Sequence, residues 1–244
     1  MDSLTSAAAS GMRARMEALD LLANNIANGS APGFKADRET YGLYLSPDAA
    51  ESPVTPTTVP VVERNWTDFA QGTLIPTGNP LDLAISGKGF FAATAPSGPV
   101  FTRAGSFQLS MQGDLETAEG YPVQGQDGKN IRVDPLKAVE VAPDGTIRQD
   151  GQEVARIAVL DFPDMSALSK RGHAYFSTDS SAAQPAPASA EVHQGKLESA
   201  NAQPAENGVR LVSVMRQFEM LQRALSIGAE MNRRTLDEVA RVSG

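Results

Sequence analysis

Residues that could carry out chemistry are few in this chain of 244 amino acids, and their spacing does not favour a catalytic or metal site. There is no cysteine, which excludes disulfides, thiolate metal ligands and cysteine nucleophiles. The two histidines, His173 and His193, lack the His-x-x-x-His or His-Glu-x-x-His spacing that brings two ligands to one helix face. We interpret both as structural or surface residues, and we predict no metal and no cofactor.

Other short patterns resemble known sites only superficially. Gly87-Lys88-Gly89 lacks the eight-residue Walker pattern and is better explained as a bend after a strand. Acidic residues at 127–134 and 144–150 lack the order of a calcium-binding loop, and no Gly-x-Ser-x-Gly elbow occurs. The sequence does not decide whether two carboxylates form a glycoside-hydrolysing pair, because such a pair is defined by its distance in space. With 14 aromatic residues and one Trp, however, the composition disfavours a cleft in which sugars stack on aromatic rings. We predict no catalytic residues and a protein that is not an enzyme.

The charge and hydropathy of the chain limit the classes of partner that it is expected to have. The chain has 21 basic and 29 acidic side chains, and this net charge of −8 argues against a nucleic-acid partner. At 41% hydrophobic residues it can form a packed core. No stretch approaches the roughly 18 consecutive apolar residues of a membrane-spanning helix, and the N-terminal segment lacks the features of a secretory signal. We expect neither direct membrane insertion nor a cleaved signal peptide.

Helix-breaking residues divide the chain into helical ends and a different middle. All 16 prolines lie between Pro32 and Pro204, and 17 of the 21 glycines lie between Gly33 and Gly208. In the first end, apolar positions recur at heptad-like spacings of three and four, which predicts an amphipathic helix over residues 3–28. These positions are Leu4, Ala8, Met12, Met16, Leu19, Ala23 and Ile26.

The other end has a similar pattern. We expect Asn201 to be the N-cap of a second long helix, with Pro204 in its first turn, where the missing N–H does no harm. The pattern slips at Gly228 and then resumes. One face of this helix is marked by Leu211, Val214, Met215, Phe218, Leu221 and Leu225.

The middle is predicted to be mostly antiparallel β over residues 67–178. Alternation of apolar and polar residues from Leu81 to Ser86 predicts a half-buried strand, and the apolar run Val154–Leu160 predicts a central strand. The fold class is therefore α+β. The expected domains are an N-terminal helix, an extended connector, a β-rich domain and a C-terminal helix, at residues 1–31, 32–66, 67–200 and 201–244.

The apolar stripes of the two predicted terminal helices allow two interpretations. The terminal helices either pack on each other and close a monomer, or share their stripes among subunits. A head-to-tail contact whose rotation does not close would build a helical filament or tube.

Ordered motifs accompany these elements along nearly the whole chain. They are Leu22–Asn28, Pro32–Lys35, Gln71–Leu74, Thr77–Ile85, Gly87–Phe91, Thr102–Phe107, Gly120–Val123 and Gln194–Asn201. Together they resemble the motifs of the bacterial flagellar axial proteins, the rod and hook family. Within that family, Val214–Met220 departs from the Glu-Thr-Gln-Arg-Ala-Tyr-Glu-like run usual in the distal rod subunit. This departure favours the proximal rod subunit, with the distal subunit as the alternative.

The resemblance implies an architecture. Long N- and C-terminal helices would form a coiled-coil-like bundle around a mostly antiparallel β central domain, with the helices in the inner core and the β domain outside. It also implies that terminal-helix residues are the assembly interface. These residues are Leu4, Met12, Met16, Leu19, Asn24, Asn25, Ile26, Asn28, Leu211, Met215, Phe218, Leu221 and Leu225.

The resemblance also implies a function and partners. Such a protein is a structural subunit of the flagellar basal-body rod, a hollow drive shaft in the periplasmic space that transmits torque and lets export substrates pass. Its partners are copies of itself, the other rod subunits and, during secretion, the flagellar export apparatus. Two competing interpretations are an enzyme or carbohydrate-binding module with helical ends, and a secreted β-rich binding module or adhesin. No constellation of site residues supports the first, and the second leaves the paired heptad ends unexplained.

Overall fold

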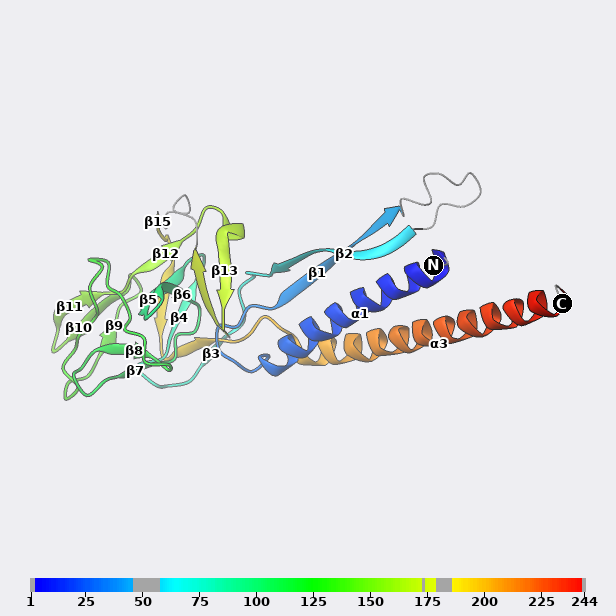
Figure 1. Ribbon diagram of the computed structural model, residues 1–244. Coiled ribbons are helices and arrows are strands. Elements are labelled where there is room, and N and C mark those ends of the chain that lie inside the picture. The colour runs from blue at the N-terminus through cyan, green and yellow to red at the C-terminus, as the bar shows by residue number, and fades with distance from the viewer. Residues whose placement is uncertain (1–2, 46–57, 173, 179–185, 243–244) are drawn as a thin grey trace. The chain divides into compact units, whose positions relative to one another are not determined.

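The computed structural model describes residues 3–45, 58–172, 174–178 and 186–242 (Figure 1). The chain divides into two compact units. The terminal unit comprises Met1–Ala27, Asp37–Thr67 and Gln203–Gly244, and the central unit comprises Asn28–Ala36 and Asp68–Ala202. The two ends of the chain therefore belong to one unit, although the central unit separates them in the sequence.

Two helices and a β ribbon form the terminal unit. Helix α1 spans Ser3–Ala27 and helix α3 spans Pro204–Val242, and the two lie side by side and antiparallel (Figure 1). Strands β1 (Asp37–Leu45) and β2 (Thr58–Thr67) pair antiparallel, and the ribbon contacts α1. Most of the segment expected as an extended connector therefore belongs to β1 and β2 where the structure describes it.

The helix pair corrects the expected coiled-coil-like bundle around the β domain. Among the described residues the α-helices are α1 and α3 alone, and they pack as one pair within the terminal unit. Heptad spacing requires only one partner helix, and the other end of the same chain provides it. Helices at the ends and a β-rich middle still fit the α+β class.

Every strand pairing in the described part of the central unit is antiparallel. The largest sheet has the order β13-β14-β6-β5-β12-β15, and smaller sheets have the orders β11-β10-β9, β16-β4, β17-β3 and β7-β8. The bounds are β3 Leu74–Pro76, β4 Leu83–Ser86, β5 Phe90–Ala95, β6 Gly98–Thr102, β7 Phe107–Leu109, β8 Leu115–Thr117, β9 Glu140–Val141, β10 Thr146–Gln149, β11 Gln152–Arg156, β12 Val159–Asp161, β13 Leu168–Arg171, β14 Tyr175–Thr178, β15 Ala186–Pro187, β16 Glu191–Gln194 and β17 Lys196–Glu198, with a short 3₁₀ helix at Met165–Ala167.

The core of the central unit lies on both faces of β5. Phe90 and Phe91 are consecutive, so their side chains point to opposite faces of the sheet. Phe91 belongs to a cluster that includes Ile85 of β4, whereas Phe90 packs with Phe176 of β14, their ring centroids 5.6 Å apart. Burial on both faces explains why this strand reads as a continuous apolar run.

Two local expectations are wrong. The run Val154–Leu160 is not one central strand, because β11 ends at Arg156 at the edge of its sheet and β12 begins at Val159. Asn201 does not cap α3, since its side chain accepts the Ala36 N–H at 2.7 Å and donates to the Asp68 carbonyl at 2.6 Å. The Asn201 side chain therefore bonds to the main chain inside the central unit, a use that local sequence patterns do not encode.

Candidate functional site

Helix α1 packs against α3 through small and apolar residues at successive turns. Ala14, Ala18 and Leu22 are buried, and the last two form a cluster with Val214 of α3. Leu211 packs at the edge of that cluster. Small side chains let two helix backbones approach closely. Ala14, Ala18 and Leu22 are therefore the inner face of α1.

The predicted apolar stripe of α1 lies beside this inner face, displaced by one residue or about 100° around the helix. Met12, Leu19 and Ile26 are half-buried, Met16 is 54% exposed and Asn24 is exposed. The side chain of Leu4 lies outside the described residues. We name Met12, Met16, Leu19 and Ala23 the side stripe of α1, in which Leu19 packs at the edge of the cluster with Val214 while Met16 and Ala23 are exposed.

Asn25 belongs to the interior. Its side chain is buried, its Nδ2 donates to the Asp37 carbonyl at 2.8 Å, and its Oδ1 accepts the Asp37 N–H at 3.0 Å. The Asp37 carboxylate in turn accepts the Thr67 hydroxyl at 2.8 Å. This reciprocal pair joins the end of α1 to the start of β1 within the terminal unit. Asn28, also a predicted interface residue, is buried in the central unit.

The residues of α3 that were predicted to form the assembly interface divide into two groups by exposure. Met215 is exposed, whereas the others are half-buried along the face that carries buried Val214. We name this the inner face of α3. It comprises Leu211, Val214, Phe218, Leu221 and Leu225, which follow one another at spacings of three and four.

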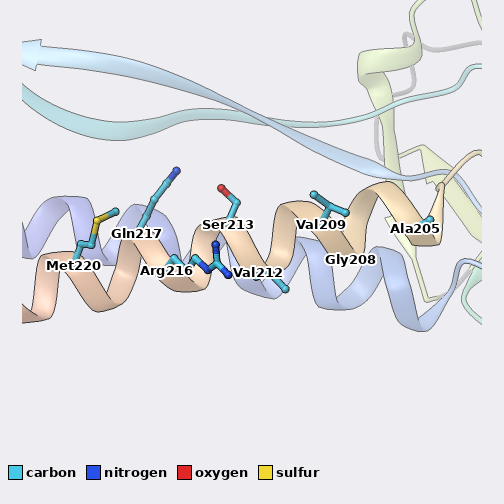
Figure 2. Close-up of a pocket in the computed structure, with 8 residues that line it drawn as sticks. All are labelled: Ala205, Gly208, Val209, Val212, Ser213, Arg216, Gln217 and Met220. Carbon is cyan, nitrogen blue, oxygen red and sulfur yellow. The ribbon is translucent and has the colours of Figure 1, made fainter.

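A second apolar row runs along the opposite side of α3, about 180° from the inner face. Its members are 50% to 74% exposed, and three of them, Val209, Val212 and Met220, are among the α3 residues that line a shallow open pocket (Figure 2). Sequence reasoning missed this row, because Arg216 interrupts it and the inner-face pattern is more regular. We name Val209, Val212, Met220, Ile227 and Met231 the outer stripe of α3.

Glu198 is the centre of a buried charged cluster in the central unit. Its Oε1 accepts hydrogen bonds from Lys35 Nζ at 2.5 Å and from the Gly72 N–H at 2.9 Å, and its Oε2 accepts one from Arg103 Nη1 at 3.1 Å. The side chains of Lys35 and Glu198 are fully buried. Lys35 Nζ also donates to the Ala70 carbonyl at 2.8 Å. One buried carboxylate therefore holds two buried cations.

Burial governs the electrostatics of this cluster. It lowers the pKa of Lys35 below its ordinary value of 10.5, since the charged form loses its hydration. Attraction to Glu198 opposes this shift only in part, and repulsion by Arg103 adds to it. The guanidinium of Arg103 also lies 5.4 Å from the centroid of the Phe90 ring, over its face. The cluster is thus tied into the aromatic core.

The cluster gives a physical role to three of the sequence motifs. Lys35, Arg103 and Glu198 come from the motifs Pro32–Lys35, Thr102–Phe107 and Gln194–Asn201. Gly33 lies next to the cluster with φ +67°, and its N–H donates to the Glu198 carbonyl at 2.8 Å. A Cβ at Gly33 would lie 2.2 Å from the Ala104 nitrogen, so only glycine fits.

The sequence contains a few residues that could be metal ligands or part of a phosphate-binding loop, and the structure shows where they lie. No group of three His, Cys, Asp or Glu side chains is arranged for a metal ion among the described residues. His193 Nε2 lies 3.8 Å from Glu191 Oε2, and His173 lies outside the described residues. No helix in the described ranges is both long and apolar enough to cross a membrane. Gly87-Lys88-Gly89 joins β4 to β5, and Arg103 Nη2 donates to the Gly87 carbonyl at 2.6 Å.

Comparison with family models matches three segments of the chain. Residues 6–35 match the flagella basal body rod protein model, and residues 84–152 match the flagellar hook protein FlgE/F/G D1 domain. Residues 193–238 match the flagellar basal body rod FlgEFG protein C-terminal model.

Comparison with individual proteins decides the family. The chain is 35% identical to the flagellar basal-body rod protein FlgF of Caulobacter vibrioides, over 92% of this chain and 93% of that protein. The chain belongs to the flagellar basal-body rod protein family. It is also 32% identical to FlgF of Mesorhizobium japonicum, over 82% and 83% of the two chains, and 30% identical to FlgG of Caulobacter vibrioides, over 92% and 94%.

Membership in the flagellar rod family fixes the class of function. The protein is a structural rod protein, and the expectation that it is not an enzyme is confirmed by its relatives. The three family matches also frame the buried cluster, since Lys35, Arg103 and Glu198 each fall within a different match. The segments that define this flagellar rod family therefore meet at one ion-pair cluster in the central unit.

Proposed function

We propose that this flagellar rod protein joins copies of itself and other rod subunits through its terminal helices, and so contributes to a hollow shaft that transmits torque and lets export substrates pass. The observation that carries the proposal is the accessible apolar surface left on α1 and α3 after their inner faces have packed. Contiguous exposed apolar rows on a soluble chain mark sites of association.

The proposal assigns different parts to the predicted interface residues. Met16 and Met215 are exposed and available to a neighbouring subunit. Leu211 packs at the α1–α3 contact, and Phe218 lies on the same inner face. Such residues support assembly by holding α1 and α3 together, and Asn25 supports it by joining α1 to β1.

Within the rod, the proposed position is proximal. Relatives named FlgF share 35% and 32% identity with the chain, and a relative named FlgG shares 30%. The distal subunit is the alternative. The proposed location is the basal body in the periplasmic space, reached through the flagellar export apparatus, and the absence of cysteine suits a chain that passes through it unfolded.

Cryo-electron microscopy of purified basal bodies tests this function. A small tag is inserted beside Leu136, a residue that is 95% exposed in the central unit. Density from the tag in a short axial band below the outer rings is the expected result. Density along the long ring-spanning shaft would make the protein the distal subunit. Basal bodies without the tag, from cells that make the tagged protein, would overturn the rod function.

A further inference from the structure

The last segment of the central unit, residues 186–202, completes sheets that begin much earlier in the sequence. Its strands β15, β16 and β17 pair antiparallel with β12, β4 and β3 respectively. The sheets β16-β4 and β17-β3 have two strands each, so β4 and β3 have no other strand partner in the described sheets. We name residues 186–202 the closing segment.

The closing segment also supplies side chains to the interior of the central unit. Val192 is buried and packs in the same apolar cluster as Ile85 of β4. Gln194 joins two further segments, because its Nε2 donates to the Pro80 carbonyl at 2.8 Å and to the Val139 carbonyl at 2.7 Å. A central unit without the closing segment would therefore expose part of its apolar core and lose these hydrogen bonds.

The buried charges depend on the closing segment most strongly. Lys35 and Arg103 are both buried, and both donate to the carboxylate of Glu198, which the closing segment carries. Asp68 raises the pKa of Lys35 too, but less than Glu198 does. Removing one partner of a buried ion pair is strongly destabilising, and a folded domain is only marginally stable. Without the closing segment, the central unit would have to bury two cations that have lost their shared carboxylate.

We propose that docking of the closing segment gates the folding of the central unit, which holds its fold only while this segment is in place. Synthesis proceeds from the N-terminus, so Lys35 and Arg103 are made well before Glu198. The unfinished central unit therefore stays open instead of folding early. In the proposed function, this keeps the chain suited to export in an unfolded form. The inference rests on that function only for its use, since the gate itself follows from the contacts.

Hydrogen exchange of the purified full chain tests the gate. The exchange is followed by NMR at increasing urea concentrations below the unfolding transition. The reporters are the amides of Val192 and Ser199, which donate to main-chain carbonyls outside the closing segment at 2.8 Å and 2.9 Å. The references are the amides of Leu115 and Ile131, whose hydrogen bonds, at 2.9 Å and 3.0 Å, lie wholly outside the closing segment.

A gated unit opens as a whole, so all four amides should exchange through one opening. Their rates, corrected for intrinsic exchange, are expected to lie within about tenfold of one another, or ~1.4 kcal/mol. Exchange at either Val192 or Ser199 more than tenfold faster than at both references would show that the closing segment opens while the rest stays folded. That result would overturn the inference.

A substitution in the closing segment gives a second test. Glu198→Gln should speed exchange at Leu115 and Ile131 by the same factor as at Val192, because the loss of the carboxylate favours opening of the whole unit. Glu191→Gln, at a side chain that is 71% exposed in the same segment, is the matched control and should change none of these rates. Faster exchange at Val192 alone in Glu198→Gln would overturn the inference.

These outcomes are distinguishable from those of the rod function. The first test uses the unaltered chain, so it stands whether or not Glu198→Gln folds. Both tests use purified protein, and a closing segment that opens by itself would leave the rod function in place. Basal bodies without the tagged protein would overturn the rod function and leave the gate standing.

Discussion

Lys35 Nζ lies 2.5 Å from Glu198 Oε1, although 163 positions separate the two residues in the sequence. Both side chains are fully buried, and Arg103 completes the cluster from a third segment. Desolvating three charges is costly, and it is offset only while the carboxylate faces both cations. The pair thus joins the segment that follows α1 to the segment that precedes α3, inside the central unit.

Glu198→Gln should destabilise the central unit by about 3–5 kcal/mol, because it leaves Lys35 and Arg103 as uncompensated buried charges. Urea unfolding followed by the fluorescence of the chain or by circular dichroism measures this change. Lys137→Met is the matched control, since it breaks a surface contact between Lys137 Nζ and Asp150 at 2.7 Å and should leave the unfolding midpoint almost unchanged. Equal effects of the two substitutions on the free energy of unfolding would show that burial of the cluster does not raise the cost of losing an ion pair.

Stability should depend on pH through Lys35. Its pKa in the folded protein lies below 10.5, so the unfolded chain binds more protons in the window between the two pKa values. The contribution of Lys35 to the free energy of unfolding should therefore rise with pH across that window. Below the window Lys35 is charged in both states, so the full cost of burying its charge is present. Urea unfolding of the unaltered chain and of Lys35→Met from about pH 8 to about pH 10.5 measures the difference. A constant difference between the two proteins would contradict the lowered pKa.

Gly33→Ala should destabilise the central unit by ~3 kcal/mol or more, since it combines a left-handed backbone with a backbone overlap at Ala104. Gly78→Ala separates the two causes. Gly78 has a similar φ of +75° but open space around its Cβ position, so we expect a loss of only about 1 kcal/mol. Thermal unfolding of both variants is the measurement, and similar melting temperatures would refute the role of the close approach.

Asn25→Ala should cost about 1–3 kcal/mol, because the main chain of Asp37 loses both of its bonds to the buried amide. In assembled material, faster amide exchange at Asp37 and in the last turn of α1 is the expected readout. Gln222→Ala, at an exposed position of α3, serves as the control and should leave exchange unchanged. Unaltered exchange at Asp37 in the Asn25 variant would mean that other contacts hold the end of α1.

The terminal segments 1–30 and 202–244 should exchange their amide protons quickly in a dilute monomer and slowly after assembly. Much of α3 is exposed, and a helix gains little stability until its apolar surface is covered. Hydrogen exchange with mass spectrometry, on monomer and on assembled material, gives the comparison. Slow exchange across both ends of the monomer would contradict this prediction and would favour a helix pair that is already complete.

Elements whose signal is periodic could be predicted from the sequence. The expected helix over residues 3–28 matches α1 at Ser3–Ala27, and alternation around Leu83 and Ile85 marks β4. The break at Arg156 within an apolar run could not be predicted, because strand pairing ends β11 there rather than any local signal. The outer stripe of α3 was present in the sequence as Val209, Val212 and Met220, but only the exposed fractions distinguish it from the inner face.

The sequence by itself determined the helical ends, the β-rich middle and the family, because periodicity, helix breakers and motifs are properties of neighbouring residues. Only the tertiary structure decided which residues those motifs bring together. Lys35 and Glu198 carry ordinary charges in the sequence, and their role appears when folding removes water from both and places them in contact. Likewise, the predicted bundle became a single helix pair, since α3 of the same chain covers the inner face of α1 and leaves the other apolar rows accessible.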